Sequence, residues 1–328
     1  MSDSLSTGGD LQHVPVMPNE VVENLITESS GTYLDATING AGHAELMMTH
    51  LTDTGRLIGL DRDGQAVQRA RTRLDRFGES RVTVVQSDYA RLAAVCRELG
   101  ETEIHGVLFD LGLSSVQLDD PNRGFGYSNV GPLDLRFDPD EGESAAAWLQ
   151  RATESQIRDV LYRFGEEPKA KSIARAIVQN RQKSPIDTTA DLWNLLSSVV
   201  GSRMPQLGRT AARVWQALRI QVNAELNSLP TGLHDAIDLL AQGGRIVVIA
   251  YHSLEDRIVK DTFREAARLC TCPPIYPQCV CGANTRGRVV TRRVLRPSTE
   301  EIAANSRARS ARMRVFEKDV LKSERGAA

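Results

Sequence analysis

Five short apolar runs decide which architecture this chain of 328 residues can adopt. The runs are rich in Val, Ile and Leu and do not alternate with polar residues, as expected for strands buried on both faces of a parallel sheet. The segments between the first four runs have helical periodicity instead, with an apolar stripe along residues 63–77. The sequence therefore predicts a doubly wound α/β fold. Its strands are expected at residues 32–38, 56–60, 82–85, 104–109 and 245–250.

The alternation of strands and helices breaks after residue 109, and more than a hundred residues pass before the next strand. This interval begins with a Gly/Pro/Asp-rich loop at residues 119–142 and continues with four helical segments and no strand. We therefore predict a helical domain inserted after the fourth strand. The first part of the sheet domain would span residues 1–116, the inserted domain 117–208, and the second part of the sheet domain 209–328.

The later elements follow from the same patterns. A helix at about residues 210–226 would lead back to the sheet. Thr188 and Asp191 have the spacing of a capping box at the start of one inserted helix. The inserted helices are expected at 144–152, 154–164, 168–181 and 188–200, and the last strands at 288–295 and 312–317.

The segment LDATINGAGH, which begins at Leu34, joins the first strand to a flexible loop. A loop in this place lies at the carboxyl edge of the sheet, where ligands bind, and Gly40 and Gly42 let the backbone approach a ligand. Asp61 follows Gly40 by 21 residues, at the end of the second strand. A carboxylate there can accept hydrogen bonds from both hydroxyls of a ribose. The loop therefore predicts a nucleoside-containing cofactor, against the alternative of a tight turn with no ligand.

The residues around the loop favour S-adenosylmethionine over NAD. A dinucleotide fingerprint needs a third glycine where this chain has Glu45, and a carboxylate near the helix start would repel a pyrophosphate. S-adenosylmethionine has no phosphate, and its ammonium and sulfonium groups suit an acid such as Asp35 at the end of the first strand. A nicotinamide oxidoreductase remains the disfavoured alternative.

Charge and composition bear on partners and compartment. Residues 282–328 hold twelve Arg or Lys against five Asp or Glu, although the whole chain carries a formal charge of −2. A basic tail on an acidic body suggests contact with a polyanion, or a solvated basic face. The polar start is no signal peptide, and no apolar stretch is long enough to span a membrane. Five cysteines in such a chain indicate the reducing cytoplasm.

Several longer motifs occur in a fixed order from His13 to Phe316. They are HVPV from His13, DATINGAGH from Asp35, DRD from Asp61, DLGLSS from Asp110, QLDD from Gln117, RGF from Arg123, GPLDLR from Gly131, QALRI from Gln216, HSLEDR from His252 and SRARS from Ser306. In these motifs the chain resembles the bacterial RsmH (MraW) family, which methylates N4 of one cytidine of 16S ribosomal RNA at the decoding site.

The resemblance implies a class I S-adenosylmethionine-dependent methyltransferase fold, a Rossmann-like and mostly parallel seven-stranded sheet with an inserted helical domain after the fourth strand. It also implies 16S rRNA in the small ribosomal subunit as the partner, while the oligomeric state stays open with a homodimer as one option. The family's cofactor contacts fall on Ala41, Gly42, His43, Asp61, Tyr89, Asp110 and Gln117.

The chain departs from the family pattern at a few of these places. The family loop is usually richer in glycine, and Asn39 and Ala41 replace two glycines here. Asn tolerates positive φ better than most residues, whereas Ala41 would be strained if its φ were positive. Tyr89 and Tyr251 stand where the family often has Phe. A non-catalytic RNA-binding factor in ribosome assembly, which keeps the fold without turnover, is the alternative function that the altered loop supports.

Two residues are candidates for catalysis of methyl transfer to an amine. N4 of cytosine is a poor nucleophile because its lone pair is delocalised into the ring, so the enzyme must orient it and accept its protons. Many amino methyltransferases use an Asp/Asn-Pro-Pro-aromatic loop after the fourth strand, but this chain has Asp110-Leu-Gly-Leu113. Asp110 is the first candidate, with cofactor binding alone as its alternative. His252 is the second, with a place at the start of a helix beside Ser253 as its alternative.

RNA contacts are expected in two regions. Arg123, Phe125 and Tyr127 in the long loop could meet RNA by charge and stacking, or could belong to a rigid surface loop. Phosphate contacts are expected in the tail, from Arg307, Arg309, Arg312 and Arg314.

Four late cysteines form two close pairs, Cys270 with Cys272 and Cys279 with Cys281. Four thiols so spaced could make a structural zinc site, although Cys-x-Cys is less typical of zinc than Cys-x-x-Cys. Spectator thiols or an oxidisable pair are the alternatives.

Overall fold

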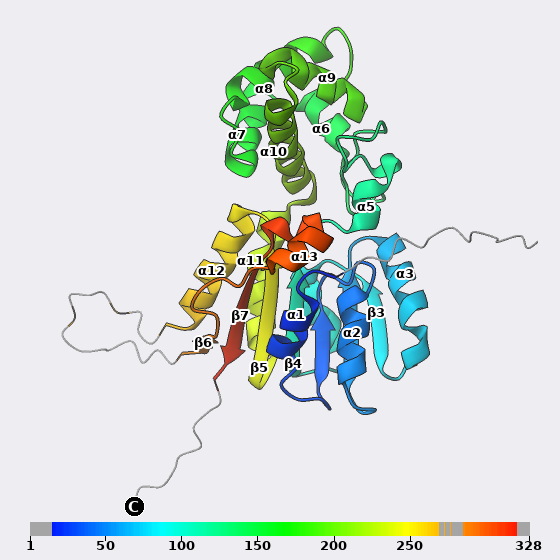
Figure 1. The fold of residues 1–328 in the computed structure, drawn as a ribbon, viewed down its shortest axis with the longest axis vertical. Helices are drawn as coiled ribbons and strands as arrows, with labels where there is room; N and C mark the ends of the chain where they lie inside the picture. The colour runs from blue at the N-terminus through cyan, green and yellow to red at the C-terminus, as the bar shows by residue number, and fades with distance from the viewer. Residues whose placement is uncertain (1–14, 269–271, 273–275, 277–284, 320–328) are drawn as a thin grey trace, which may run out of the picture.

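The computed structural model describes residues 15–268, 272, 276 and 285–319, and its main feature is a seven-stranded sheet with the order β3-β2-β1-β4-β5-β7-β6 (Figure 1). β1 to β5 pair in parallel, while β7 is antiparallel to both β5 and β6. The expected α/β sheet is thereby confirmed. The strands are β1 (Thr32–Asp35), β2 (Arg56–Asp61), β3 (Val82–Gln86), β4 (Ile104–Asp110), β5 (Leu240–Ala250), β6 (Gly287–Val289) and β7 (Arg312–Lys318).

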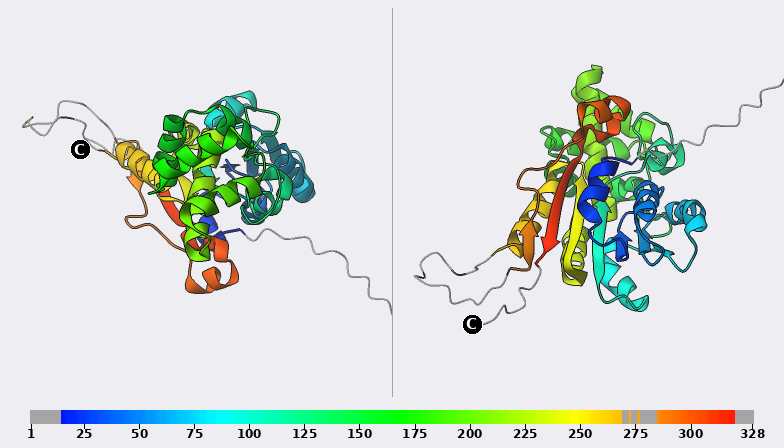
Figure 2. Two further views of the ribbon diagram at one scale, coloured as in Figure 1. Left: turned by 90° about the horizontal axis from the view of Figure 1, so that it is seen from above. Right: turned by 60° about the horizontal axis from the view of Figure 1, so that its bottom comes forward.

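Helices cover both faces of this sheet, which explains why the strands read as continuous apolar runs (Figure 2). Along β4, Leu108 packs into the core on one face, whereas Val107 and Phe109 pack into the core on the other. The first face is covered by α1 (Pro18–Leu25), α2 (Gly42–His50) and α3 (Gly64–Leu74), and the second by α4 (Leu92–Glu98), α11 (Glu225–Leu239) and α12 (Ser253–Ala266).

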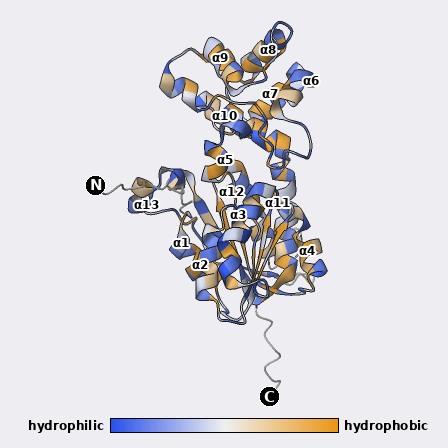
Figure 3. Cartoon of the chain, turned by 90° about the vertical axis from the view of Figure 1, so that its right-hand side faces the viewer, coloured by the Kyte–Doolittle hydropathy of each residue, from blue (hydrophilic) through white to orange (hydrophobic). Residues whose placement is uncertain are grey.

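A second body, here called the helical body, stands on the carboxyl edge of the sheet and is formed by the chain between β4 and α11 (Figures 1 and 3). Its own hydrophobic core extends from Phe125 to Leu218. Thr188 and Asp191 form the expected capping box at the start of α9. The helices are α5 (Ser115–Asp119), α6 (Ala145–Arg151), α7 (Glu154–Gly165), α8 (Ala170–Arg181), α9 (Thr189–Val200) and α10 (Met204–Asn223).

The last helix of this body differs from the sequence prediction. We expected a helix at about residues 210–226 that belongs with the sheet, but α10 begins at Met204 and its apolar side chains pack with α7 and α9. It ends at Asn223, and the left-handed backbone of the next residue, Ala224 (φ 52°), turns the chain directly into α11. The helical body therefore extends to about Asn223, beyond the boundary expected at residue 208.

The penultimate strand is also shorter than expected. β6 ends at Val289, although the apolar pattern continues to Leu295. Beyond it, the side-chain oxygen of Thr291 accepts the hydrogen bond of the Val315 amide, at 3.0 Å. A side chain thus takes the place of a ladder carbonyl, and the segment pairs with β7 again at an isolated bridge between Leu295 and Met313.

Gly165 allows α7 and α10 to pack closely, and this generates a stability prediction. A Cβ at Gly165 would lie 2.6 Å from the carbonyl oxygen of Arg213, so Gly165→Ala must push two backbones apart. We expect it to lower the free energy of unfolding by about 1–3 kcal/mol. Gly208→Ala is the matched control, because a Cβ there meets nothing within 4 Å and α10 should gain roughly 0.5–1 kcal/mol. Denaturant unfolding measures both, and equal effects would contradict the packing argument.

Candidate functional site

Loops after β1, β2, β3 and β4 meet at the carboxyl edge of the sheet and surround a cavity beneath the helical body. The cavity encloses about 620 Å³ including its opening to solvent. Three of the predicted cofactor residues line it, namely Asp61, Tyr89 and Gln117. Phe137 comes from the loop before α6 and Glu225 from the start of α11, so both bodies build this cavity.

The loop after β1 adopts the strained conformation that its glycine-poor sequence left open. Asn39 has φ 48° and Ala41 has φ 60°, both in the left-handed region. Such a conformation costs an L-residue roughly 1–2 kcal/mol, so other contacts must hold it. The amide of Asn39 donates a hydrogen bond to Asp61 Oδ2 at 2.9 Å. The carboxylate expected to bind ribose therefore also fixes the loop.

Asp61 keeps acceptor capacity for a ligand. Oδ2 accepts the Asn39 amide and Oδ1 accepts the Asp63 amide, each at 2.9 Å. A carboxylate has about four lone-pair positions, so two remain for hydroxyl groups in the cavity. Burial is the main cause that raises the pKa of Asp61 to about 6, partly offset by these two hydrogen bonds.

The other predicted loop residues stand behind the cavity wall. Ala41 is fully buried at the N-cap of α2, and Gly42 begins that helix. His43 Nε2 lies 2.8 Å from the carbonyl oxygen of Val16, and His43 Nδ1 lies 3.5 Å from Asp110 Oδ2. His43 therefore contacts the wall that carries Asp110.

Three carboxyl groups, those of Asp35, Asp61 and Asp110, lie close together at this edge. Asp35 is buried, and burial raises its pKa to about 8, with Asp110 and Asp61 nearby adding to the increase and the Thr37 amide opposing it. A cation placed beside these groups would stabilise their ionised forms. The electrostatics of the cavity therefore suit a positively charged ligand.

Glu45 does not add to this potential as the sequence suggested. Its carboxylate is bound by Arg73 Nη2 at 2.6 Å and by Arg76 Nη2 at 3.0 Å. Two guanidinium groups compensate its charge, so Glu45 repels a pyrophosphate less than its position in the sequence implied. The preference for a cationic ligand depends on Asp35, Asp61 and Asp110 instead.

Asp63 is a residue of the candidate site that the sequence reasoning missed, although it ends the motif DRD. Its carboxylate is buried and accepts hydrogen bonds from Gln117 Nε2 at 2.9 Å and Arg123 Nη1 at 3.0 Å. It also caps α3 by accepting the amide of Gln65. The only sequence signal was an acid in an N-cap position before a helix.

A second cavity adjoins the first, because Asn39, Leu111 and Gly112 line both. Asp110 and Tyr251 line the second cavity, and the Tyr251 hydroxyl donates a hydrogen bond to Asp110 Oδ1 at 2.8 Å. Asp110 thus stands at the boundary with one oxygen held by a tyrosine. The remaining polar lining comes from Ser115, Arg219, Asn305 and Arg307.

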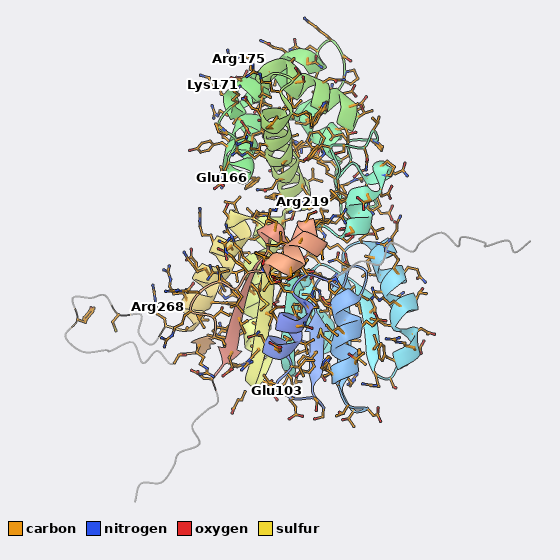
Figure 4. All side chains as sticks on the ribbon, in the orientation of Figure 1. Glu103, Glu166, Lys171, Arg175, Arg219 and Arg268 are labelled. Carbon is orange, nitrogen blue, oxygen red and sulfur yellow. The ribbon has the colours of Figure 1, made fainter. Side chains whose placement is uncertain are left out.

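Buried charges separate the two cavities. Arg219 on α10 lines the second cavity and donates to Glu225 at 2.9 Å, and it lies 3.9 Å from Glu255. Glu225 and Glu255 line the first cavity. In Figure 4, Arg219 lies at the end of α10 that meets the sheet. The helical body therefore supplies a cation to the wall of the site.

His252 occupies the alternative place considered for it, at the start of α12. It is the N-cap residue, and its Nδ1 accepts the Glu255 amide at 3.3 Å, while its Nε2 lies 3.1 Å from Glu255 Oε1. Burial raises the pKa of Glu255, but His252 and then Arg219 counteract this and hold it below the usual value. His252 lines neither cavity, so its placement supports a structural role.

The loop residues that were expected to contact RNA belong instead to a rigid loop, which was the alternative considered for them. Arg123 is buried and binds Asp63, and its Nη2 donates to the carbonyl groups of Arg136 and Phe137. Phe125 is buried and stacks on Phe137, with ring centroids 5.7 Å apart. Both residues therefore hold the loop together and are covered from solvent.

The arginines of the tail divide into paired and exposed ones. Arg307 Nη2 contacts both carboxylate oxygens of Asp119, at 2.9 and 3.0 Å. Arg312 and Arg314 pair with Asp256. Arg309 is exposed and pairs with no acid in the described part of the chain. Of the predicted tail contacts, Arg309 is the most available for a phosphate.

The cysteine prediction falls largely outside the described residues. Cys270, Cys279 and Cys281 lie beyond them, and Cys272 is described as partly exposed. Within the described part of the chain, no group of three His, Cys, Asp or Glu side chains is placed to hold a metal ion. The zinc site therefore stays a prediction.

The sequence model of the MraW methylase family matches residues 10–319. The chain belongs to the MraW methylase family. A protein named ribosomal RNA small subunit methyltransferase H from Thermomicrobium roseum is 44% identical over 318 residues, which cover 97% of this chain and 96% of that protein. One of the same name from Geobacter sp. (strain M21) is 44% identical over 310 residues, which cover 94% and 99%.

A solved rRNA methylase from Streptococcus thermophilus is similar with a TM-score of 0.40 and 11% identity, over 92% of this chain and 94% of that one. The architecture of this MraW-family protein is described by its own sheet order, β3-β2-β1-β4-β5-β7-β6. Within the described residues, each helix is too short or too polar to span a lipid bilayer.

The raised pKa of Asp35 generates a prediction about stability and pH in this MraW-family protein. Between its ordinary value of 3.8 and about 8, the native state binds more protons than the unfolded state. The contribution of Asp35 to stability therefore falls as pH rises through this range, by up to about 1.4 kcal/mol per pH unit. Asp35→Asn should remove this loss, so its advantage over the wild type should grow from pH 4 to pH 8.

Urea unfolding at each pH measures the difference between variant and wild type. Asp53→Asn is the matched control, because the Asp53 side chain is fully exposed and should give a constant difference. If the Asp35→Asn curve ran parallel to the wild type across the range, Asp35 would not be the buried, proton-binding acid described here.

Proposed function

We propose that this protein transfers a methyl group from S-adenosylmethionine to N4 of a specific cytidine in the decoding region of 16S ribosomal RNA. The observation that carries the proposal is the pair of adjoining cavities, one lined by Asp61, Tyr89 and Gln117, the other containing Asp110. The names of the curated relatives support the small-subunit RNA as substrate. Modification of that RNA would place the protein in the cytoplasm.

The residues of the first cavity fit S-adenosylmethionine. Asp61 has two unused acceptor positions for the ribose hydroxyls, and Tyr89 offers a ring for an adenine. Asp110 offers a carboxyl group beside the site, and an ammonium or sulfonium bound there would favour the ionised form of Asp35. Gln117 is oriented by its hydrogen bond to Asp63. When bound, the cofactor supplies an electrophilic methyl group.

The second cavity fits an amine that must be oriented. The Asp110 carboxylate can accept a hydrogen bond from the cytosine amino group, since only one of its oxygens is held by Tyr251. Holding N4 toward the first cavity converts a bimolecular step into a unimolecular one, and such positioning supplies about 7–11 kcal/mol of a barrier. The amine loses one proton as the N–C bond forms, and Asp110 is the only carboxylate among the described residues that line this cavity.

The target base must leave its helical stack to enter this cavity, because a paired cytosine cannot present N4 in line. Asn305 and Arg307 of the tail line the second cavity, so the nucleotide would pass beside them. The alternative is a ribosome-assembly factor that binds RNA and lacks turnover. The strained loop at Asn39 and Ala41 motivates it, although the contact with Asp61 holds that loop in place.

Nucleoside mass spectrometry tests the proposal directly. Unmethylated small ribosomal subunits are incubated with the protein and S-adenosylmethionine, and the digested RNA should contain new N4-methylcytidine. Calorimetric titration should show binding of S-adenosylmethionine and no binding of NAD. Cofactor binding without a methylated nucleoside would favour the assembly factor, and binding of NAD alone would favour the oxidoreductase.

Asp110→Asn separates a reacting carboxylate from one that only holds the cofactor. The amide preserves the shape and can still accept the Tyr251 hydrogen bond, but it is a far weaker proton acceptor. We expect turnover to fall by about 10²–10⁴ while the dissociation constant of S-adenosylmethionine changes little. Equal losses in affinity and turnover would assign Asp110 to the cofactor alone. Asp53→Asn, at a fully exposed side chain that lines neither cavity, is the matched control.

A further inference from the structure

A cleft on the helical body, which shares no lining residue with either cavity, has an unusual set of charges. It lies between the turn that joins α7 to α8 and the first half of α10 and encloses about 690 Å³ including its opening. Three cations and two neutral hydrogen-bonding side chains surround one carboxylate. The lining includes Glu167, Lys169, Gln206, Arg209, Thr210 and Arg213.

Glu167 distinguishes this cleft from a group of charges on an open surface. The residue is only 2% exposed, and its Oε1 accepts the backbone amide of Lys169 at 2.9 Å. Its Oε2 is buried without a hydrogen-bond partner among the described residues, and the nearest cation is Arg213 Nη1, at 3.6 Å. A buried carboxylate oxygen is normally hydrogen-bonded. The charge of Glu167 holds the Arg213 guanidinium at the cleft, although the two groups are too far apart for a hydrogen bond.

The cations of the cleft keep most of their donors. Within the described residues, neither the Lys169 ammonium nor the Arg213 guanidinium donates a hydrogen bond, and Arg209 uses only Nε, toward the Pro205 carbonyl. Arg307, Arg312 and Arg314 of the tail are instead held by carboxylates. The free positive charge of this cleft exceeds its single carboxylate, and such a set of donors matches a phosphate group.

The cleft lies close to the carboxyl edge of the sheet. Glu166, the neighbour of Glu167, accepts a hydrogen bond from the Ser253 hydroxyl at 3.2 Å, at the first residue of α12. Glu255, two residues further on, lines the cofactor cavity. Figure 4 shows Glu166 at the end of the helical body that faces α12. A strand of RNA with one nucleotide in the second cavity would pass this part of the surface.

We propose that the cleft of Lys169, Arg209 and Arg213 binds a backbone phosphate of the ribosomal RNA, near the target nucleotide. This inference rests on the proposed function for the identity of the RNA. The cleft contributes affinity and register and takes no part in methyl transfer. Glu167 positions Arg213 and leaves the outer guanidinium donors for the phosphate oxygens.

Filter binding of unmethylated small ribosomal subunits over a series of KCl concentrations tests the cleft. Lys169→Ala and Arg209→Ala are the variants, because removing Arg213 would leave the buried Glu167 without its counter-charge. Each should weaken subunit binding about tenfold and reduce the slope of log K against log salt by about 0.7–0.9, the loss of one phosphate contact. Turnover at saturating subunits and the affinity for S-adenosylmethionine should stay unchanged.

Lys183→Ala is the matched control, since Lys183 is exposed just beyond the opposite end of α8. It should bind as the wild type does, and all variants should share the wild-type thermal midpoint. Wild-type affinity and salt slope in both cleft variants would overturn the proposal. A loss seen with whole subunits and absent with naked 16S RNA would also overturn it, because the partner would then be a ribosomal protein.

Two further outcomes keep this inference separate from the proposed function. Binding is measured without methyl transfer, so a wild type that makes no N4-methylcytidine while the variants lose RNA affinity would refute the function and support the cleft. Calorimetry with inorganic phosphate identifies the source of the anion. If phosphate bound tightly and did not compete with subunits, the cleft would be a small-anion site, and the RNA contact would be refuted.

Discussion

The buried carboxylate of Asp63 is the interaction on which the arrangement of the site depends. It joins Gln117, which lines the first cavity, to Arg123, which anchors the loop before α6. Arg123 in turn binds the carbonyl of Phe137, another residue of the cavity wall. Breaking a buried charged pair typically costs about 3–5 kcal/mol, because the remaining charge is left without compensation. One side chain after β2 therefore fixes how the helical body closes the site.

The cofactor cavity stores unfavourable energy that a cationic ligand would release. Asp35 and Asp61 are buried close to Asp110, and burial raises the pKa of both. The loop beside them holds Asn39 and Ala41 in left-handed conformations. Strain and like charge of this kind persist only where the surrounding structure fixes them, and they are frequent at functional sites. The cost in stability and the affinity for a cation thus have the same origin.

Much of the fold could be predicted from the sequence because burial on both faces of a sheet is recorded in local composition. The runs that became β1 to β5 and the Thr188–Asp191 capping box depend on neighbours within a few residues. The end of the helical body could not be found in this way. Gly208 lies inside α10, where glycine lowers helix propensity, and the packing of that helix against α7 is not local.

The site was predictable where each residue follows its own strand, as with Asp61, Tyr89 and Asp110. It was not predictable where the partner is distant in the chain. Arg123 looked like a loop cation, but its partner Asp63 lies 60 residues earlier. His252 replaces the usual Ser, Thr, Asp or Asn at an N-cap, so its structural role had no ordinary signal.

Charge counted along the sequence does not reveal which cations are free in the folded protein, and the reason concerns geometry. The tail has the highest density of Arg, yet Asp119 and Asp256 pair with three of these side chains in the folded protein. Free cations gather instead beside Glu167. Two contacts between the bodies fix that cleft relative to Asp110, from Arg62 Nη1 to the Asn223 carbonyl at 2.7 Å and from Ser253 to Glu166. A phosphate held there would set the position of the nucleotide that reaches the second cavity.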